Sequence, residues 1–296
     1  MTHHPHRFDA AHARALAATA SRRAAQALVA GFAAWLLSAC GGGGSADPAA
    51  PGTPATLIAP VTTASAHRVV TLDHGAFTLR YDCDERSTVR YSYTLGVDTG
   101  NAARPTVFAL GDPQLPADCA QQTRTATYAS VAPGWDRGHL VTANHMDASD
   151  ALIAQTFWMT NIVPQRSLLN QGIWADAEAI AECYRDLAPV QVVGGVVYGD
   201  GPTDTANDWF VASHGIRTPE RFWMVLVTQD ANGPKAIAWS IPNTDALGAL
   251  DSYLVSIAAL EAQVGADAVG LPVLSSDLKA QRASASWPLP VGCNPG

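Results

Sequence analysis

Two histidines and an arginine crowd into one short stretch, WDRGHLVTANHMD, at residues 135–147. After residue 39 the chain has only five histidines, and two of them, His139 and His145, lie here. His139 is the type of side chain best suited to general-base catalysis near neutral pH. Arg137 lies two residues earlier, and on an extended strand both side chains point to the same side. A base and a fixed positive charge could therefore face one phosphate, with Gly138 leaving room for close backbone approach.

DRGH alone fits a surface turn with a salt bridge better than a catalytic strand, so the downstream sequence matters. It continues with QTFWMTNIVPQ (155–165) and NQGIWADAE (170–178). Asn170, Trp174 and Glu178 are four residues apart, which predicts one side of a helix with Asn170 near its N-terminus. An amide carbonyl and a carboxylate are oxygen donors suited to Mg²⁺. The alternative is that Asn170 caps the helix and Glu178 faces solvent; Trp174 is expected in the core.

The segments DRGHLVTANHMD, TFWMTNIVPQ and NQGIWADAE, in this order and spacing, resemble the DNA/RNA non-specific endonuclease family of the ββα-metal superfamily. The resemblance covers about residues 67–265. It implies an α+β fold with a mostly antiparallel β-sheet core flanked by helices. It also implies that the active site lies on a β-hairpin followed by a helix.

The same resemblance implies roles for individual residues. His139 matches the general base that deprotonates the attacking water. Asn170 matches the direct protein ligand of a single Mg²⁺, with Mn²⁺ as the other candidate ion. Glu178 matches the carboxylate that holds metal-bound waters. Arg137 matches the arginine that contacts phosphate and stabilises developing charge.

Two further residues match the family on the supporting side of the site. Asn161 matches the asparagine of the TNI segment that supports the site, and we group it with the predicted catalytic residues. Asp136 is expected to orient its neighbours. Where this chain has Thr142 the family often has proline, a difference that removes no chemical group. His145 is expected to be structural or to line the substrate site.

The resulting functional prediction is a metal-dependent endonuclease that hydrolyses phosphodiester bonds of DNA and RNA with little sequence preference, leaving 5′-phosphate ends. One alternative is a non-catalytic nucleic-acid-binding surface lipoprotein. That alternative predicts lost catalytic groups and a basic, aromatic groove, whereas the chain has only two lysines, Lys235 and Lys279. Another alternative is a phosphodiesterase acting on a smaller substrate, which the same groups would serve.

The N-terminus predicts export. Eleven apolar or small residues, ALVAGFAAWLL (27–37), follow Arg22 and Arg23 and precede LSAC, which ends at Cys40. The run is too short to span a bilayer and resembles a bacterial lipoprotein signal. We therefore expect a signal peptide at 1–39, a flexible tether at 40–65 and an endonuclease domain at 66–296. We also expect a lipid anchor on Cys40, with the protein facing the periplasm or the cell exterior. An ordinary signal peptide is the alternative, and the oligomeric state stays open.

The net charge and the cysteine content indicate how the protein could bind nucleic acid and how its fold is cross-linked. Beyond residue 39 the chain carries 14 basic and 25 acidic residues, a net charge of −11, which argues against a broad basic face for nucleic acid. Four cysteines remain after Cys40, and an exported protein with an even number predicts two disulfides. Three pairings are open, and we favour Cys83 with Cys119 and Cys183 with Cys293. No cysteine spacing is typical of zinc.

Periodicity predicts the elements that position the motifs. Alternating apolar and polar residues predict strands at HRVVTLD, FTLRYD, TVRYSYTLG, VQVVGGVVYG, RFWMVLVT and KAIAWSIP, the last two joined by a QDANGP turn. Residues 97–130 read as loops. Helices are predicted over 166–188 and 245–263. Strands and helices do not alternate regularly, which favours α+β over a doubly wound fold.

Overall fold

The computed structural model describes residues 67–199 and 207–295. The predicted signal peptide, the tether and Cys40 lie outside these residues. The chain divides into two units, Met1–Val61 and Thr62–Gly296, and all described residues belong to the second. No helix within 67–199 or 207–295 is both long enough and apolar enough to cross a membrane.

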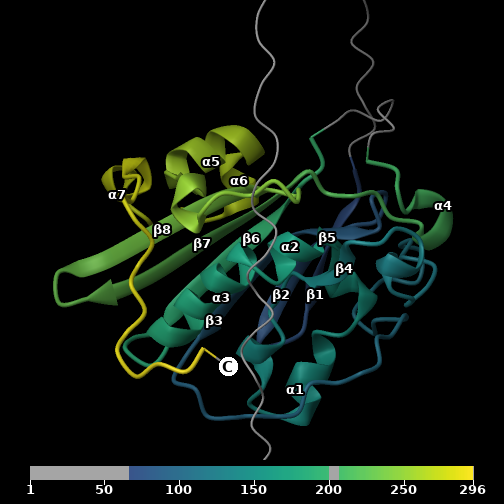
Figure 1. The fold of residues 1–296 in the computed structure, drawn as a ribbon, viewed down its shortest axis with the longest axis horizontal. Coiled ribbons are helices and arrows are strands. Elements are labelled where there is room, and N and C mark those ends of the chain that lie inside the picture. The colour runs from purple at the N-terminus through teal and green to yellow at the C-terminus, as the bar shows by residue number, and fades with distance from the viewer. Residues whose placement is uncertain (1–66, 200–206, 296) are drawn as a thin grey trace, which may run out of the picture. The chain divides into compact units, whose positions relative to one another are not determined.

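A seven-stranded sheet forms the centre of the unit, in the order β1-β2-β3-β6-β7-β8-β9 (Figure 1). Every neighbouring pair in it is antiparallel, which confirms the predicted α+β class. The strands are β1 (Val69–Asp73), β2 (Phe77–Asp82), β3 (Ser87–Leu95), β6 (Val190–Val197), β7 (Arg221–Asp230), β8 (Gly233–Pro242) and β9 (Leu254–Val255). The six predicted strand segments correspond to the first six of these strands.

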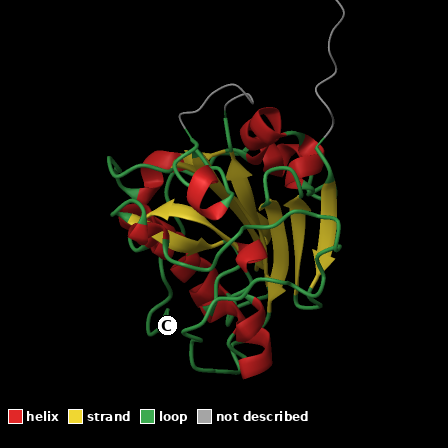
Figure 2. Cartoon of the chain, turned by 90° about the vertical axis from the view of Figure 1, so that its right-hand side faces the viewer, coloured by secondary structure: helices red, strands yellow, loops and turns green. Residues whose placement is uncertain are grey.

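Both faces of the sheet are buried, because alternate side chains of a strand enter different cores. On β7, Phe222 and Met224 join the large core that contains Trp174, whereas Trp223 and Val225 join a smaller core with Leu260. Helix α3 (Ile173–Tyr184) therefore packs on one face, and helices α5 (Ile257–Val264) and α6 (Ala266–Val269) cover the other (Figures 1 and 2).

A separate two-stranded hairpin carries the DRGH motif. Strand β4 (Trp135–His139) pairs antiparallel with β5 (Ile162–Arg166), so that Trp135 lies opposite Arg166 and His139 opposite Ile162. Helices α2 (Ser167–Asn170) and α3 follow β5 directly. This is the hairpin-then-helix order that the family resemblance implies. The remaining helices are α1 (Asp150–Gln155), α4 (Val211–His214) and α7 (Ser276–Ala280), with short 3-10 helices at Tyr128–Ser130, Asn144–Met146, Met159–Asn161 and Leu250–Tyr253.

The single helix predicted over 166–188 was wrong. The chain forms α2, breaks at Gln171 and Gly172, and resumes as α3, which ends at Tyr184. Gly172 is not helical, with φ −114° and ψ −118°. A Cβ at this position would lie 2.5 Å from the Leu168 carbonyl oxygen, so the break depends on glycine. An apolar stripe that continues across such a break does not reveal it.

The helix predicted over 245–263 was also wrong in its first half. Helix α5 begins only at Ile257, where the Ser256 hydroxyl accepts a hydrogen bond from Ala259 N at 3.1 Å and caps the helix. Before it, Leu254 and Val255 pair with β8. Hydrogen bonding to the edge of that strand satisfies their backbone, which competes with helix formation.

Two disulfides join the cysteines in the favoured pairing. Cys83 is bonded to Cys119, and Cys183 on α3 is bonded to Cys293. The second disulfide attaches the C-terminal segment to α3. Close by, the Tyr184 hydroxyl donates to the Pro288 carbonyl at 3.1 Å, and Asn144 Nδ2 donates to the Pro295 carbonyl at 3.2 Å. The C-terminal segment therefore lies against both α3 and the residues that follow DRGH.

Candidate active site

His139 ends β4 inside an aromatic surround. The ring of Phe157 lies edge-on at 4.8 Å between centroids, and that of Phe108 lies at 5.5 Å. Only 6% of His139 is exposed, and its Nε2 is buried without a hydrogen-bond partner. Arg104 Nη2 approaches Nδ1 at 3.4 Å. Because a guanidinium can only donate, Nδ1 faces it with a lone pair when the ring is neutral.

Burial, together with the positive charges of Arg104 and Arg137, lowers the pKa of His139 to about 3. The imidazole is therefore neutral at physiological pH and able to accept a proton. A phosphate bound beside the two arginines would offset their charge and bring the pKa of His139 back toward neutrality, where a general base works best.

Arg137 lies on the same side of β4 as His139, as predicted from their spacing. Its guanidinium stacks over the Phe108 ring at 3.8 Å, and that ring also contacts His139. Nη1 donates to the Thr125 carbonyl at 2.9 Å. This contact uses one of the five N–H donors of a guanidinium, so others remain for a phosphate.

Gly138 has a different purpose from the one expected from sequence. A Cβ here would lie 2.3 Å from Gln165 Oε1 on the neighbouring strand. The glycine therefore makes room for the buried Gln165 side chain and faces away from the side that carries Arg137 and His139. Close approach of a phosphate to this backbone, the expected reason, is not what the packing requires.

Asp136 organises the start of the helical region. Its Oδ1 accepts from the Ser167 hydroxyl at 2.7 Å, and its Oδ2 accepts from Asn170 Nδ2 at 2.9 Å and Gln171 Nε2 at 2.7 Å. This contact fixes the orientation of the Asn170 amide. It uses Nδ2 of Asn170 and leaves Oδ1 of Asn170, the atom able to ligate a cation, without a contact to Asp136. Asn170 is the last residue of α2, not the start of a long helix, and precedes the first turn of α3.

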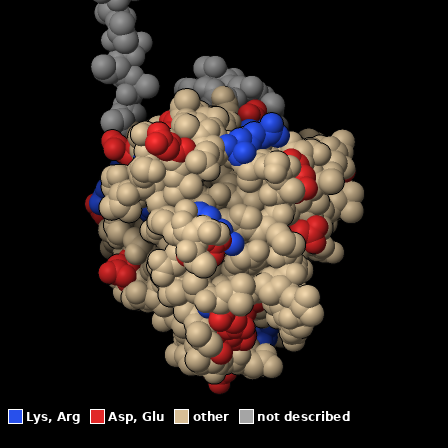
Figure 3. Space-filling view, turned by 90° about the vertical axis from the view of Figure 1, so that its left-hand side faces the viewer, with Lys and Arg blue, Asp and Glu red and all other residues tan. Residues whose placement is uncertain are grey.

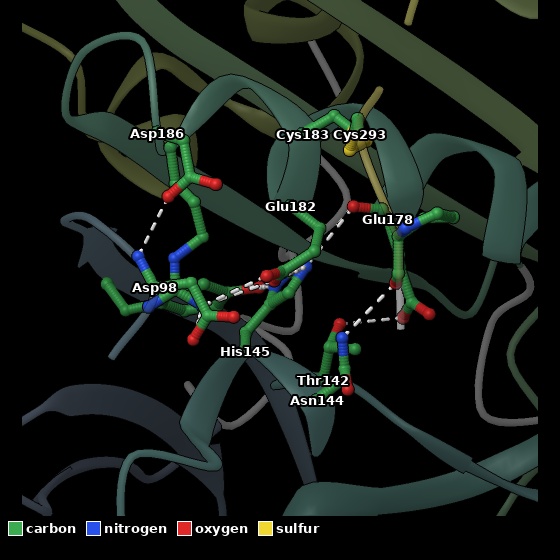
Figure 4. A network of polar contacts seen from close by, with 12 residues as sticks. Asp98, Thr142, Asn144, His145, Glu178, Glu182, Cys183, Asp186 and Cys293 are labelled. Carbon is green, nitrogen blue, oxygen red and sulfur yellow. Dashed lines mark hydrogen bonds and ion pairs between the residues drawn. A yellow bond between two sulfur atoms is a disulfide. The ribbon is translucent and has the colours of Figure 1, made fainter. Parts of the chain in front are cut away.

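Glu178 lies in the middle of α3 and points toward the segment after DRGH (Figure 4). The Thr142 hydroxyl donates to Glu178 Oε1 at 2.8 Å. Burial raises the pKa of Glu178 to about 7, although the Thr142 hydrogen bond and the charge of Arg104 act in the opposite direction. Glu178 is therefore not the fully solvated carboxylate of the alternative interpretation. Trp174, one turn earlier, is 1% exposed and belongs to the core, as expected.

His145 is a structural residue, as predicted. Its Nδ1 shares a 2.7 Å hydrogen bond with the Tyr93 hydroxyl. Its Nε2 lies 3.2 Å from the carbonyl oxygen of Glu178 (Figure 4). It is 4% exposed, and burial lowers its pKa to about 3. Both ring nitrogens are occupied by protein groups, so the ring positions the backbone of α3 beneath Glu178.

Asn161 is not a catalytic group in the structure, which corrects the grouping made from sequence. Its Oδ1 accepts from Val141 N at 2.8 Å, while Nδ2 donates to the carbonyls of Val141 and Thr156, both at 2.9 Å. The side chain is fully buried. Because its amide is occupied by backbone groups on both sides, Asn161 fixes the chain immediately after His139 and does not reach a substrate.

Arg104 is the site residue that sequence reasoning missed. It is exposed, lies beside His139 Nδ1, and its charge acts on both His139 and Glu178. It comes from the TGNAARP loop, 35 residues before His139, in a region that carries no helical or strand periodicity. The only signal in the sequence was a basic residue in a loop of a strongly acidic chain.

The site therefore has two connected ends on one hairpin. At the start of β4, Asp136 holds Asn170. At its end, His139, Arg137 and Arg104 gather around Phe108 and Phe157, with Arg104 extending its charge to Glu178. Hard oxygen donors at one end of the hairpin, and a neutral imidazole with two guanidinium groups at the other, are groups that suit hydrolysis of a phosphate ester.

These features define a ββα-type hydrolytic site, and the chain belongs to the DNA/RNA non-specific endonuclease family, whose model matches residues 53–270. The match begins within the segment predicted as a tether. Two curated relatives are nucleases by name. Nuclease EXOG, mitochondrial, of Danio rerio is 29% identical over 143 residues, covering 45% of this chain and 41% of the relative. Endonuclease G, mitochondrial, of Homo sapiens is 28% identical over 141 residues, covering 45% and 47%.

The matched stretch thus spans less than half of the length of these relatives. Among solved structures, one described as a crystal structure of the EndoG/EndoGI complex is similar at a TM-score of 0.48 and 18% identity, over 66% of this chain and 83% of that one.

Proposed function

We propose that the protein is a metal-dependent endonuclease that hydrolyses phosphodiester bonds in DNA and RNA with little sequence preference. The observation that carries the proposal is the juxtaposition of a buried, neutral His139 with two arginines, Arg104 and Arg137, at the end of the DRGH strand. Family membership supports the same reaction class.

The donor set fits a divalent cation. Asp136 turns the Asn170 amide so that Nδ2 is occupied and Oδ1 remains for a ligand. Glu178 adds a carboxylate whose Oε1 is held by Thr142. Amide and carboxylate oxygens are ligands that Mg²⁺ accepts, often through its own waters, and Mn²⁺ uses the same donors. When bound, the cation supplies positive charge next to the scissile phosphate.

The residues of the chain supply the remaining chemistry. His139 takes a proton from a water molecule as the water oxygen forms its bond to phosphorus. The bond from phosphorus to the 3′ oxygen breaks, and that oxygen acquires a proton from solvent. Arg137 and Arg104 stabilise the negative charge that develops on the phosphate oxygens. The products carry a 5′-phosphate and a 3′-hydroxyl.

Little sequence preference follows from contacts to the backbone alone, since phosphates carry no base identity. The acidic composition is compatible with such an enzyme, because a metal ion and two arginines attract one phosphate without a broad basic surface. The face shown in Figure 3 carries scattered acidic and basic side chains and no continuous basic area.

Plasmid cleavage by the purified chain, with Mg²⁺, with Mn²⁺ and with EDTA, tests the proposal. We expect nicking that requires the ion, falls by roughly a hundredfold to ten-thousandfold in His139→Ala, and leaves ends that a ligase can rejoin. Plasmid that stays intact while a small phosphodiester is hydrolysed would favour a phosphodiesterase. Binding without any hydrolysis would favour a nucleic-acid-binding protein.

We also propose export as a lipoprotein anchored through Cys40, on the basis of the basic pair, the short apolar run and the LSAC sequence. Metabolic labelling with a fatty acid, in wild type and in Cys40→Ser, tests this. Label that depends on Cys40 supports the anchor. A mature protein cleaved elsewhere and free of label contradicts it.

A further inference from the structure

A pocket of 350 Å³ is lined in part by the β4–β5 hairpin that carries the DRGH motif. Trp135 and Arg166 contribute to its lining, and they face each other across the β4–β5 hairpin. Trp135 precedes Arg137 by two residues on β4, so the two side chains point to the same side of the strand. The volume falls in the range of roughly 300–1,000 Å³ that is usual for small-ligand sites. A strand whose phosphate occupies the active site would therefore have a neighbouring unit next to this pocket.

Trp209 forms one wall and is unusually exposed for its size, at 58%. The residue after it, Phe210, is fully buried and packs edge-on against Trp135 at 5.5 Å. The exposed indole is therefore anchored to the DRGH strand through its neighbour. An exposed tryptophan held in a fixed place next to a phosphate-cleaving site is a platform on which any base can stack.

Arg166 provides the charge of the pocket. Its guanidinium stacks on the Trp135 ring at 4.1 Å and remains 26% exposed. Arg166 forms an ion pair with Asp245, which is 3.4 Å away and 49% exposed, and such surface pairs contribute little to stability. A phosphate could therefore take the place of Asp245. Arg221, the other arginine of the pocket, already donates twice to Ser240.

Asn243 joins another part of the lining to β5. The Asn243 side chain accepts from Arg166 N at 2.8 Å and donates to the carbonyls of Pro164 and Pro219 at 3.1 and 2.8 Å. Glu220 is the acidic residue of the lining, so the pocket does not attract anions throughout. One guanidinium, one exposed indole and polar walls match a nucleoside with a single phosphate better than a longer run of phosphates.

We propose that this pocket is a nucleoside subsite, in which one base of the bound strand stacks on Trp209 and the adjoining phosphate contacts Arg166. The inference rests on the proposed nuclease function and adds to it a place for the substrate outside the reacting bond. It makes the enzyme prefer a polynucleotide over a small diester while leaving base identity unread, because every base has a face to stack.

The test measures binding and cleavage separately. Binding of a single-stranded oligonucleotide is followed by fluorescence anisotropy on the His139→Ala background with Mg²⁺. We expect Trp209→Ala to raise Kd about fivefold to a hundredfold, whereas Trp209→Phe retains most of the affinity. Leu187→Ala, which removes another exposed apolar side chain (66%) that does not line this pocket, is the matched control and should change nothing.

An oligonucleotide with abasic sites allows a double-mutant cycle between Trp209 and the base. If Trp209 stacks on a base, substituting abasic sites through the oligonucleotide weakens wild-type binding, and Trp209→Ala then adds little further loss. Arg166→Gln should lower the slope of log Kd against log salt by about one phosphate contact. In otherwise wild-type enzyme, Trp209→Ala should raise KM for DNA and leave hydrolysis of a small diester unchanged.

The outcomes separate the two proposals. Equal Kd values for wild type, Trp209→Ala and Trp209→Phe overturn the subsite, whether or not the enzyme cleaves. Trp209-dependent binding in a wild-type protein that cleaves no nucleic acid overturns the nuclease and leaves the subsite standing. An equal loss of activity on DNA and on the small diester also overturns the subsite, because it indicates a general effect on the catalytic end.

Discussion

At the scale of single residues, Thr142 is the position at which this chain differs from a common family pattern and gains a contact. A proline there could not donate, whereas the Thr142 hydroxyl donates to Glu178 Oε1 at 2.8 Å. Asn161 fixes the intervening backbone by bonding both the N–H and the carbonyl of Val141. Thr142 is thus a positioning residue for Glu178, the carboxylate that we propose takes part in metal binding.

Thr142→Val should weaken cleavage without unfolding the protein, because it keeps the shape and removes the donor. A hydrogen bond to a carboxylate is typically worth about 1.5–3 kcal/mol, so we expect a loss of roughly tenfold to a hundredfold in kcat/KM on plasmid. The Mg²⁺ concentration for half-maximal activity should rise. Thr142→Ser keeps the hydroxyl and should retain most activity; equal losses in both variants would refute the positioning role.

Glu178→Gln should stabilise the fold at alkaline pH while it abolishes cleavage. The pKa of Glu178 in the folded protein, about 7, lies above the ordinary glutamate value of 4.5, so folding favours the protonated carboxyl. The stabilisation is complete below about pH 4.5 and is lost as pH rises through 7. At pH 8 the ionised side chain should cost about 1–3 kcal/mol, which glutamine avoids.

Urea unfolding in EDTA at pH 5 and pH 8 measures this difference. The gain from Glu178→Gln should be larger at pH 8 than at pH 5. A gain of the same size at both pH values would contradict the prediction, because it would mean that folding does not raise the pKa of Glu178.

The motifs indicated where the candidate site residues lie along the chain. The spacing in DRGH predicted that Arg137 and His139 share one side of β4, because local spacing fixes which side chains share a strand face. The catalytic roles of His139, Asn170 and Glu178 stay predictions. Arg104 was beyond that reasoning. Its position depends on the path of a long irregular loop, which periodicity does not encode.

At the scale of elements, the β4–β5 hairpin depends on Gly138. Gly138→Ala would place a methyl group against the Gln165 side chain, at a position 2.3 Å from Oε1. We expect a loss of roughly 1–3 kcal/mol in unfolding free energy, the usual cost of overpacking. Removing the obstruction in Gly138→Ala/Gln165→Ala should recover part of it. No recovery in the double variant, measured by urea unfolding, would show that another neighbour is responsible.

The helix predictions show why element boundaries were harder to predict than element types. The apolar stripe through Leu169, Ile173 and Ile180 correctly indicated helix, but Gly172 interrupts it for a reason set by the Leu168 carbonyl. Leu254 and Val255 prefer the edge of β8. Both outcomes depend on tertiary contacts, so a local window could not contain them.

At the scale of the whole molecule, period-two alternation predicted an antiparallel α+β fold but not the strand order. Strand β6 pairs with β3 although β4, β5 and two helices that bear the site lie between them in sequence. The site is thus an insertion between two neighbouring strands of one sheet. Side-chain pattern states which face a strand buries, and says nothing about which strand lies beside it.

The two disulfides should differ in their contribution to stability. Cys183–Cys293 spans 110 residues and Cys83–Cys119 spans 36. Loop-closure entropy gives about 5 and about 4 kcal/mol, respectively. Replacing both cysteines of the longer pair by serine should therefore cost about 1 kcal/mol more than the same change in the shorter pair. Urea unfolding of the two double variants measures this, and a reversed order would show that local packing outweighs chain entropy.

The longer disulfide also orders events during biosynthesis. A ribosome delivers α3 long before it delivers Cys293, because the two cysteines are 110 residues apart. The bond can close only after strands β6 to β9 and the helices that follow them have emerged. Helix α3, which bears Glu178, therefore remains without its disulfide until Cys293 has been synthesised. The bond then forms only once the chain is in an oxidising environment.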